Sequence, residues 1–207
     1  STSAKAAWFS TIRSVATRSE TLEWLESIWR RERQVEGLPL AETDEADLAL
    51  DLAVRDVPHA EPILDAQLAR FINPDRRARF AFIMPAVSRD PAVRERFFEG
   101  LEDVRNRAHE AWVLDAVRYL HHPLRASSSA GLVRPALNLV WDIQRTGDIF
   151  FPKRWTDATL SGYQTAAMAE EVRAFIASLP PDYPPRLRWV LLASADPLFR
   201  AARILGQ

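Results

Sequence analysis

Apolar residues recur at helical spacing along almost the whole chain, and this pattern constrains the fold more than any other feature. Side chains at i, i+3 or i+4 and i+7 share one face of a helix, whereas a half-buried strand alternates apolar and polar residues. Three clear stretches are Leu22, Leu25, Ile28 and Trp29; Val113, Val117 and Leu120; and Met168, Val172, Phe175, Ile176 and Leu179. Sustained alternation with β-branched residues is missing from the sequence. The sequence therefore predicts an all-α fold.

Proline and glycine indicate where these helices begin and end. A capping side chain stands directly before a proline, which predicts a helix start, at Asn73-Pro74, Asp90-Pro91 and Asp196-Pro197. Gly37 and Gly147 stand where a helix should end with a positive-φ residue, and Pro123 should stop the helix before it. Because the links are short, we expect antiparallel helix hairpins. A pair spacing of roughly 30–40 residues favours their stacking as a HEAT/armadillo-like α-α superhelix, in a single domain over residues 1–207.

The region from 126 to 143 combines a predicted connector with an unusually apolar helix. "ASSSAG" (126–131) is the best flexible connector in the chain, although it is too short to indicate two domains. The stretch around 132–143 leaves little polar face. Such a helix belongs in an inner layer or under a partner surface.

Composition excludes several classes of site and partner. The chain has no cysteine, so disulfides, thiol nucleophiles and thiolate metal sites are excluded. Lys and Arg total 27 and Asp and Glu total 28, so net charge gives no support for a nucleic-acid footprint. No apolar run approaches the ~20 residues that a membrane-spanning helix needs. We expect neither a nucleic-acid partner nor a membrane segment in this chain.

Known catalytic motifs are incomplete or missing. "HEAWV" (109–113) begins like the zinc motif H-E-x-x-H, but Val113 stands where the second imidazole is needed. His121 and His122 are adjacent and point about 100° apart on a helix, which favours a role at a helix end over metal binding. Neither a phosphate-binding G-x-x-x-x-G-K-[ST] loop nor a G-x-S-x-G nucleophile elbow occurs. We assign no catalytic, cofactor-binding or metal-binding residue.

The stretch "QRTGDIFFPKRWTDATLSGYQT" (144–165) is the least ordinary part of the sequence. A helical pattern stops at a glycine and is followed by two phenylalanines, a proline, nearby cations and a tryptophan. Three interpretations are open: a packed corner between helices, a docking surface and a catalytic loop. In a packed corner, the aromatic rings of "DIFFP" would fold under neighbouring helices. In a docking surface, a missing domain would be the partner of Phe150, Phe151, Lys153 or Arg154.

Four segments resemble one enzyme family. They are "NPDRRARFAFIMPAVSRDPAVRERFF", "EAWVLDAVRYLHHPLR", "IQRTGDIFFPKRWTDATLSGYQT" and "VRAFIASLPPDYPPRLRWVLLASADPLFRAARI". They are similar to the C-terminal helical region of bacterial gluzincin zinc aminopeptidases, the group that includes membrane alanyl aminopeptidase and leukotriene-hydrolase-like enzymes. The similarity covers roughly residues 40 to 202, and "LHHPLR" and "TGDIFFPKRW" are its most specific parts.

The resemblance implies a fold and a context but no catalytic site. Members hold zinc with H-E-x-x-H and a downstream glutamate, and bind the substrate amine with a G-x-M-E-N loop; neither motif occurs here. Their C-terminal region is a helical superhelix that helps to enclose the substrate chamber. We therefore expect an excised, non-catalytic C-terminal domain, consistent with a start that lacks methionine. Its partner would be the catalytic domain of the same polypeptide, which would carry the zinc, and it would meet the peptide substrate only indirectly. The alternative is a free-standing helical-repeat scaffold that binds other proteins.

Overall fold

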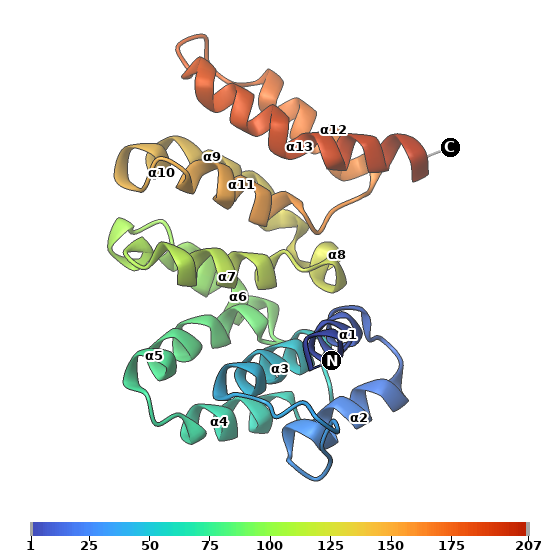
Figure 1. The fold of residues 1–207 in the computed structure, drawn as a ribbon. Helices are drawn as coiled ribbons and strands as arrows, with labels where there is room; N and C mark the ends of the chain where they lie inside the picture. The colour runs from blue at the N-terminus through green and yellow to red at the C-terminus, as the bar shows by residue number, and fades with distance from the viewer. Residues whose placement is uncertain (1, 206–207) are drawn as a thin grey trace. The chain divides into compact units, whose positions relative to one another are not determined.

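A computed structural model describes residues 2–205, and over that range the chain forms helices and loops without a strand (Figure 1). An isolated bridge pairs Val35 with Leu38 in one loop. The all-α prediction is confirmed. Contacts within the chain group it into two compact units, Ser1–Arg89 and Asp90–Gln207, and each unit is described separately. The expectation of one domain over residues 1–207 stays a prediction.

Unit 1 is built around a single apolar helix. Its elements are α1 (Thr2–Val15), α2 (Ser19–Trp29), α3 (Glu42–Val54), α4 (Ala60–Arg70), α5 (Pro74–Ile83) and the 3-10 helix η1 (Met84–Val87). Helix α3 contacts α1, α2, α4 and η1. It is buried on several sides because Leu48, Leu50 and Leu52 are all fully enclosed. A helix that is apolar around most of its circumference belongs at the centre of a unit.

An arginine joins the end of α1 to α3. Arg55, which follows α3, donates from Nε to the carbonyl of Ala16 at 2.6 Å. Its Nη2 donates to the carbonyls of Arg13 at 2.8 Å and Ser14 at 2.9 Å, and its Nη1 to that of Asp51 at 2.7 Å. The last carbonyls of a helix lack intrahelical donors and form its negative end, so a guanidinium is well suited to them. Arg55 therefore both caps α1 and fixes it against α3.

A second arginine does the same for α2. Arg70 donates to the carbonyl of Trp29 at 2.9 Å, and its guanidinium lies 4.1 Å from the centre of the Trp29 ring. The buried Trp29 indole N–H donates to Oε1 of the fully buried Gln67 at 2.8 Å. The end of α2 is thus fixed to α4 by three contacts: the Arg70 hydrogen bond, the Arg70 cation–π contact, and the hydrogen bond from the Trp29 indole to Gln67.

Unit 2 contains the remaining elements. These are α6 (Pro91–Gly100), η2 (Val104–Arg107), α7 (Glu110–Leu120), η3 (Pro123–Arg125), α8 (Ala126–Ser129), η4 (Ala130–Leu132), α9 (Val133–Asn138), α10 (Val140–Thr146), α11 (Phe151–Leu160), α12 (Ala166–Ala177) and α13 (Pro185–Leu205). Figure 1 shows α7, α11 and α13 stacked in that order, and α11 contacts both of the others. Trp155 of α11 is fully buried, and its indole N–H donates to the carbonyl of Ala136 at 2.9 Å.

The region from 126 to 143 is more ordered than expected. The prediction of a flexible connector at 126–131 is wrong, because these residues form α8 and the start of η4, and Ser129 is fully buried. The apolar stretch that follows is split into α9 and α10, which share Leu139 as a cap. Its inner position is confirmed, because Val133, Leu137 and Val140 are almost completely enclosed.

Two of the three predicted proline starts are confirmed. Asn73 accepts hydrogen bonds from the N–H groups of residues 75 and 76, and Asp90 accepts one from residue 92. The start predicted at Asp196-Pro197 is wrong, because α13 continues through both residues. Asp196 forms an ion pair with Arg200 at 2.7 Å instead of capping. Packing of Leu191 and Leu198 into the core keeps α13 continuous despite the ladder hydrogen bond that Pro197 cannot form.

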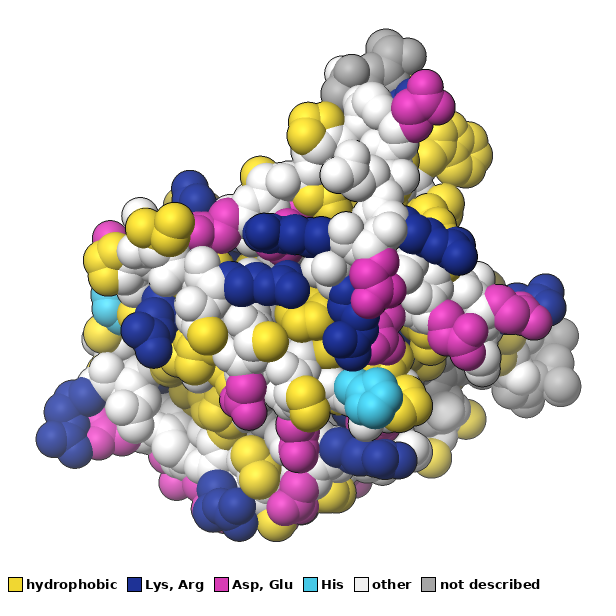
Figure 2. Space-filling model, turned by 90° about the horizontal axis from the view of Figure 1, so that it is seen from below, with side chains coloured by type: hydrophobic (Ala, Val, Ile, Leu, Met, Phe, Trp, Pro, Cys, Tyr) yellow, Lys and Arg dark blue, Asp and Glu magenta, His cyan; other side chains and the backbone are white. Residues whose placement is uncertain are grey.

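Charges of both signs are mixed on the face seen from below Figure 1. Basic and acidic side chains are interspersed there, with hydrophobic side chains between them (Figure 2). A continuous patch of one sign, which nucleic-acid-binding surfaces display, does not cover the described part of this face. In addition, no helix within residues 2–205 is long and apolar enough to cross a membrane.

The capping role of Arg55 predicts a specific loss of stability. Arg55→Lys should lower the free energy of unfolding by about 1–3 kcal/mol, because one ammonium cannot reach carbonyls on two helices at once. Arg18→Lys is the matched control, since Arg18 is exposed and pairs with the equally exposed Glu20 at 3.3 Å. Urea denaturation of both variants measures the difference. Equal stability of the two variants would contradict the role assigned to Arg55.

Candidate docking surface

The corner between α10 and α11 contains all four residues predicted to contact another domain. Phe150 is 62% exposed, whereas Phe151 is 1% exposed and belongs to the core. Lys153 donates to both carboxylate oxygens of Asp157 at 2.6 Å. Arg154 is exposed and lies 5.7 Å from the centre of the Phe150 ring. The expected burial of both aromatic rings is therefore right for Phe151 and wrong for Phe150.

Gly147 ends α10 for a steric reason. Its φ of −116° and ψ of −176° are extended, so the prediction of a positive-φ residue is wrong here. A Cβ at this position would lie 2.5 Å from Cδ1 of Phe151 and 2.9 Å from Oε1 of Glu110. Glycine is required because the buried ring and the carboxylate occupy that space. The other predicted glycine, Gly37, does have a φ of 70°, but it lies in the loop well after α2 has ended.

Hydrogen bonds then fix the corner after the glycine. The backbone N–H of Asp148 donates to Oε1 of Glu110 at 2.6 Å. Oδ1 of Asp148 accepts from the N–H of Phe150 at 2.8 Å, and its carbonyl accepts from the N–H of Phe151 at 3.0 Å. The first turn of α11 is therefore held by its own sequence and by α7. A corner with this many local partners has few alternative conformations.

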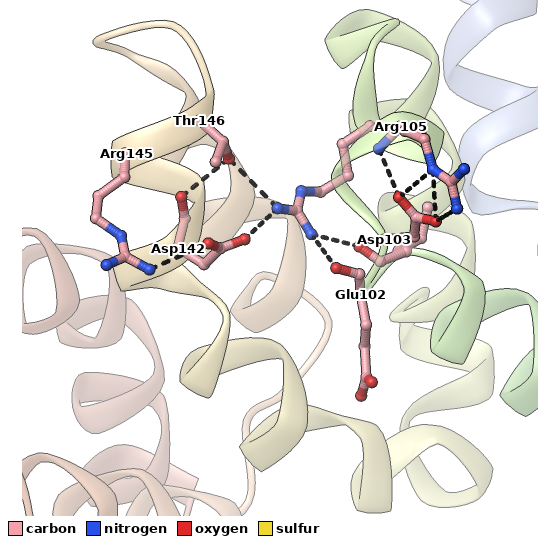
Figure 3. Close-up of polar contacts among 8 residues, drawn as sticks. Glu102, Asp103, Arg105, Asp142, Arg145 and Thr146 are labelled. Carbon is pink, nitrogen blue, oxygen red and sulfur yellow. Dashed lines mark hydrogen bonds and ion pairs between the residues drawn. The ribbon is translucent and has the colours of Figure 1, made fainter.

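The buried Arg107 joins the neighbouring loop to the same corner through Glu102, Asp142 and Thr146, which Figure 3 labels. Arg107 is almost completely enclosed and donates to the carbonyls of Leu101 at 2.6 Å and Glu102 at 3.0 Å. Its other terminal nitrogen pairs with the carboxylate of Asp142 and donates to Oγ1 of Thr146 at 3.3 Å. One side chain thus caps α6 and holds α10. Nothing in the sequence distinguishes Arg107 from the other arginines, so sequence reasoning missed it.

Arg105, on the same loop as the enclosed Arg107, is largely exposed to solvent. It pairs with Asp103, as Figure 3 shows. Hydrogen bonds from the Arg105 side chain and backbone N–H lower the pKa of Asp103 to about 2. The carboxylate is therefore ionised at neutral pH and its charge is matched locally.

These contacts fix the backbone of the corner, and several apolar side chains there remain exposed. Ile149 and Phe150 are 68% and 62% exposed, and Val104 on the neighbouring loop is also exposed. Arg154 beside them has no acidic partner within residues 2–205. We call Ile149, Phe150 and Arg154 the corner surface. Aromatic and arginine side chains that are held in place before binding are typical anchors of protein interfaces.

His121 and His122 take part in contacts at helix ends. His121 ends α7, is fully buried, and places Nδ1 2.8 Å from the Tyr163 hydroxyl. His122 accepts from the N–H of Leu124 and begins η3, so the predicted helix-end roles of both are confirmed. Burial lowers the pKa of His121 to about 3 and raises that of Tyr163.

The residues present do not fit a zinc site. At the single H-E pair, His109 stacks on Trp112 with ring centres 4.1 Å apart, and a valine stands at the second imidazole position. Within the described range, no three His, Asp or Glu side chains gather in a way that could hold a metal ion.

No protein-family model, curated protein or solved structure matches this chain. The resemblance to aminopeptidases therefore rests on the sequence segments quoted above.

Steric exclusion at Gly147 predicts a stability loss that a control glycine will not show. Gly147→Ala should lower the free energy of unfolding by about 1–3 kcal/mol, because its methyl group overlaps the buried Phe151 ring. Gly131→Ala is the control, since a Cβ there has no atom within 4 Å. Thermal unfolding measures both. If Gly147→Ala is as stable as Gly131→Ala, the steric explanation fails.

Burial of His121 predicts a pH dependence of stability. Its pKa in the folded state is below the ordinary value, so between about pH 6.5 and 3 the unfolded chain binds a proton that the folded chain does not. Stability should therefore fall as the pH drops below about 6.5, by about 1.4 kcal/mol for each pH unit. His121→Asn should lose this contribution in urea denaturation at pH 7, 6 and 5, while His109→Gln should keep it. Identical pH slopes for the wild type and His121→Asn would contradict it.

Proposed function

We propose that this chain is a non-catalytic C-terminal helical domain of a zinc metalloaminopeptidase. In this role it packs on the catalytic domain of the same polypeptide and helps to enclose the substrate chamber. The proposal starts from the four segments that resemble the family over roughly residues 40 to 202. Zinc and the residues that bind it would belong to the catalytic domain.

One observation carries the proposal: two of the four similar segments, 110–125 and 143–165, pack against each other through helices α7 and α11. At one end Glu110 accepts a hydrogen bond from Asp148, and at the other end His121 meets Tyr163. A Cβ on Gly162 would lie 1.9 Å from the carbonyl oxygen of His121, so close packing requires glycine there. Two segments that are distinctive in sequence are therefore neighbours in space, as we would expect if both belong to the domain architecture of that family.

We further propose that the hairpins stack as a HEAT/armadillo-like α-α superhelix. Two contacts support this arrangement within unit 2. Glu110 and Asp148 mark the beginnings of α7 and α11, and His121 and Tyr163 follow their ends, so the two helices run parallel. Parallel stacking of equivalent helices from successive hairpins is expected of a helical solenoid.

The contribution of such a domain to catalysis would be indirect. A zinc aminopeptidase activates water with its metal and a general base, which this chain does not supply. Its helices would limit the access of water and position the chamber wall. The corner surface is the part we assign to contact with the catalytic domain, because it joins exposed apolar side chains to an unneutralised cation.

A reconstitution experiment tests this function. The upstream reading frame should contain H-E-x-x-H, and its product, made without this chain, should hydrolyse aminoacyl-anilides poorly. Adding this chain in trans should raise turnover about tenfold or more, because it completes the chamber. The isolated chain should show no turnover. A frame without a zinc motif, or chelator-sensitive turnover by the isolated chain, would contradict the proposal.

A paired variant separates the docking surface from the domain assignment. Phe150→Ser combined with Arg154→Glu should raise the chain concentration needed for half-maximal turnover about tenfold or more, since interface anchors often contribute 2 kcal/mol or more. Trp8→Ser, at another exposed aromatic residue in unit 1, is the control. If the paired variant reconstitutes as well as the control, docking lies elsewhere although the domain assignment stands.

A further inference from the structure

A groove between α12 and α13 in unit 2 has features of a ligand site. Its volume is about 550 Å³. That size falls in the range of small-molecule sites in proteins. It is lined by Ala166, Arg173, Asp196, Phe199, Arg200, Ala202 and Arg203.

The lining is set by helical spacing. Asp196, Phe199, Arg200 and Arg203 follow the i, i+3, i+4, i+7 pattern and so share one face of α13. Arg173 approaches from α12, and its guanidinium lies 4.6 Å from the centre of the Phe199 ring. The three arginines therefore come from two helices that pack against each other.

Charge in the groove is only partly neutralised. Arg200 pairs with Asp196 at 2.7 Å, and one terminal nitrogen of Arg173 pairs with Glu170 at 2.5 Å. Arg203 has no acidic partner within residues 2–205. The three lining arginines and their two paired carboxylates together leave one net positive charge, on Arg203.

We propose that this groove binds a phosphate group, either inorganic phosphate or a small phosphomonoester. Phosphate carries nearly two negative charges at neutral pH and several acceptor oxygens, so it can accept from Arg203 and from the remaining N–H groups of Arg173 and Arg200. One guanidinium can donate two parallel hydrogen bonds to two oxygens of a phosphate. Arginines that converge from two helices can therefore contact different faces of this tetrahedral anion. The groove has a binding role and no chemical step, and it does not depend on the function proposed above.

Phosphorus NMR titration of the whole chain at constant ionic strength tests the site. Inorganic phosphate should bind saturably with a Kd of about 1 mM or tighter. Arg203→Glu should weaken binding at least about tenfold, because it removes the free guanidinium and reverses its charge. Arg18→Glu changes the net charge equally at a position that is 79% exposed in unit 1, and it should bind like the wild type. Glycerol phosphate as a second probe distinguishes an ester from free phosphate as the preferred ligand.

Three results would overturn the proposal. They are no saturable binding by the wild type up to about 10 mM of either probe, equal weakening in Arg203→Glu and Arg18→Glu, and acetate binding as tight as phosphate. Circular dichroism confirms that each variant is folded. Arg200→Gln provides a second variant and should also weaken phosphate binding, since it removes another lining guanidinium without reversing its charge.

Discussion

The ends of α1, α2, α6 and α12 are held by arginine side chains from neighbouring helices or loops. The last carbonyls of a helix have no donors of their own, and a guanidinium offers five N–H groups with a permanent positive charge. The same contact recurs in both units: Arg55 caps α1, Arg70 caps α2, Arg107 caps α6, and Arg188 donates to the carbonyl of Ile176 near the end of α12. Short helices with short links need such contacts, because each contact sets where one helix ends relative to another.

This device gives a physical reason for the arginine content. Lys5 and Lys153 are the only lysines in the chain, and the remaining cations are arginines. Arg55 contacts carbonyls on two helices, and Arg107 joins the end of α6 to a carboxylate on α10. The ammonium group of lysine is compact and strongly hydrated, so it cannot replace a planar guanidinium group that donates to two helices at once. The composition is therefore partly structural, and the arginines of the α12–α13 groove differ in retaining excess charge.

The corner surface depends on the same contacts. Arg107 holds α10 from one side, Glu110 holds Asp148 from α7, and the absence of a side chain at Gly147 leaves room for both Phe151 and Glu110. Phe151 is consequently directed into the core while Phe150 remains at the surface. Two adjacent and identical residues thus have opposite environments, and only the exposed one is available to a partner.

The sequence by itself determined the helical class, the central apolar stretches and the caps at Asn73 and Asp90, because periodicity and capping depend on neighbours along the chain. It located the corner at 144–165 but could not separate Phe150 from Phe151, or recognise Ile149 as exposed. It also predicted a break at Pro197 and a connector at 126–131, where packing against other helices instead kept the chain helical. Only the tertiary structure decided which arginines cap, which line a groove and why Gly147 is needed. Those roles depend on atoms distant in sequence, and local patterns carry no record of them.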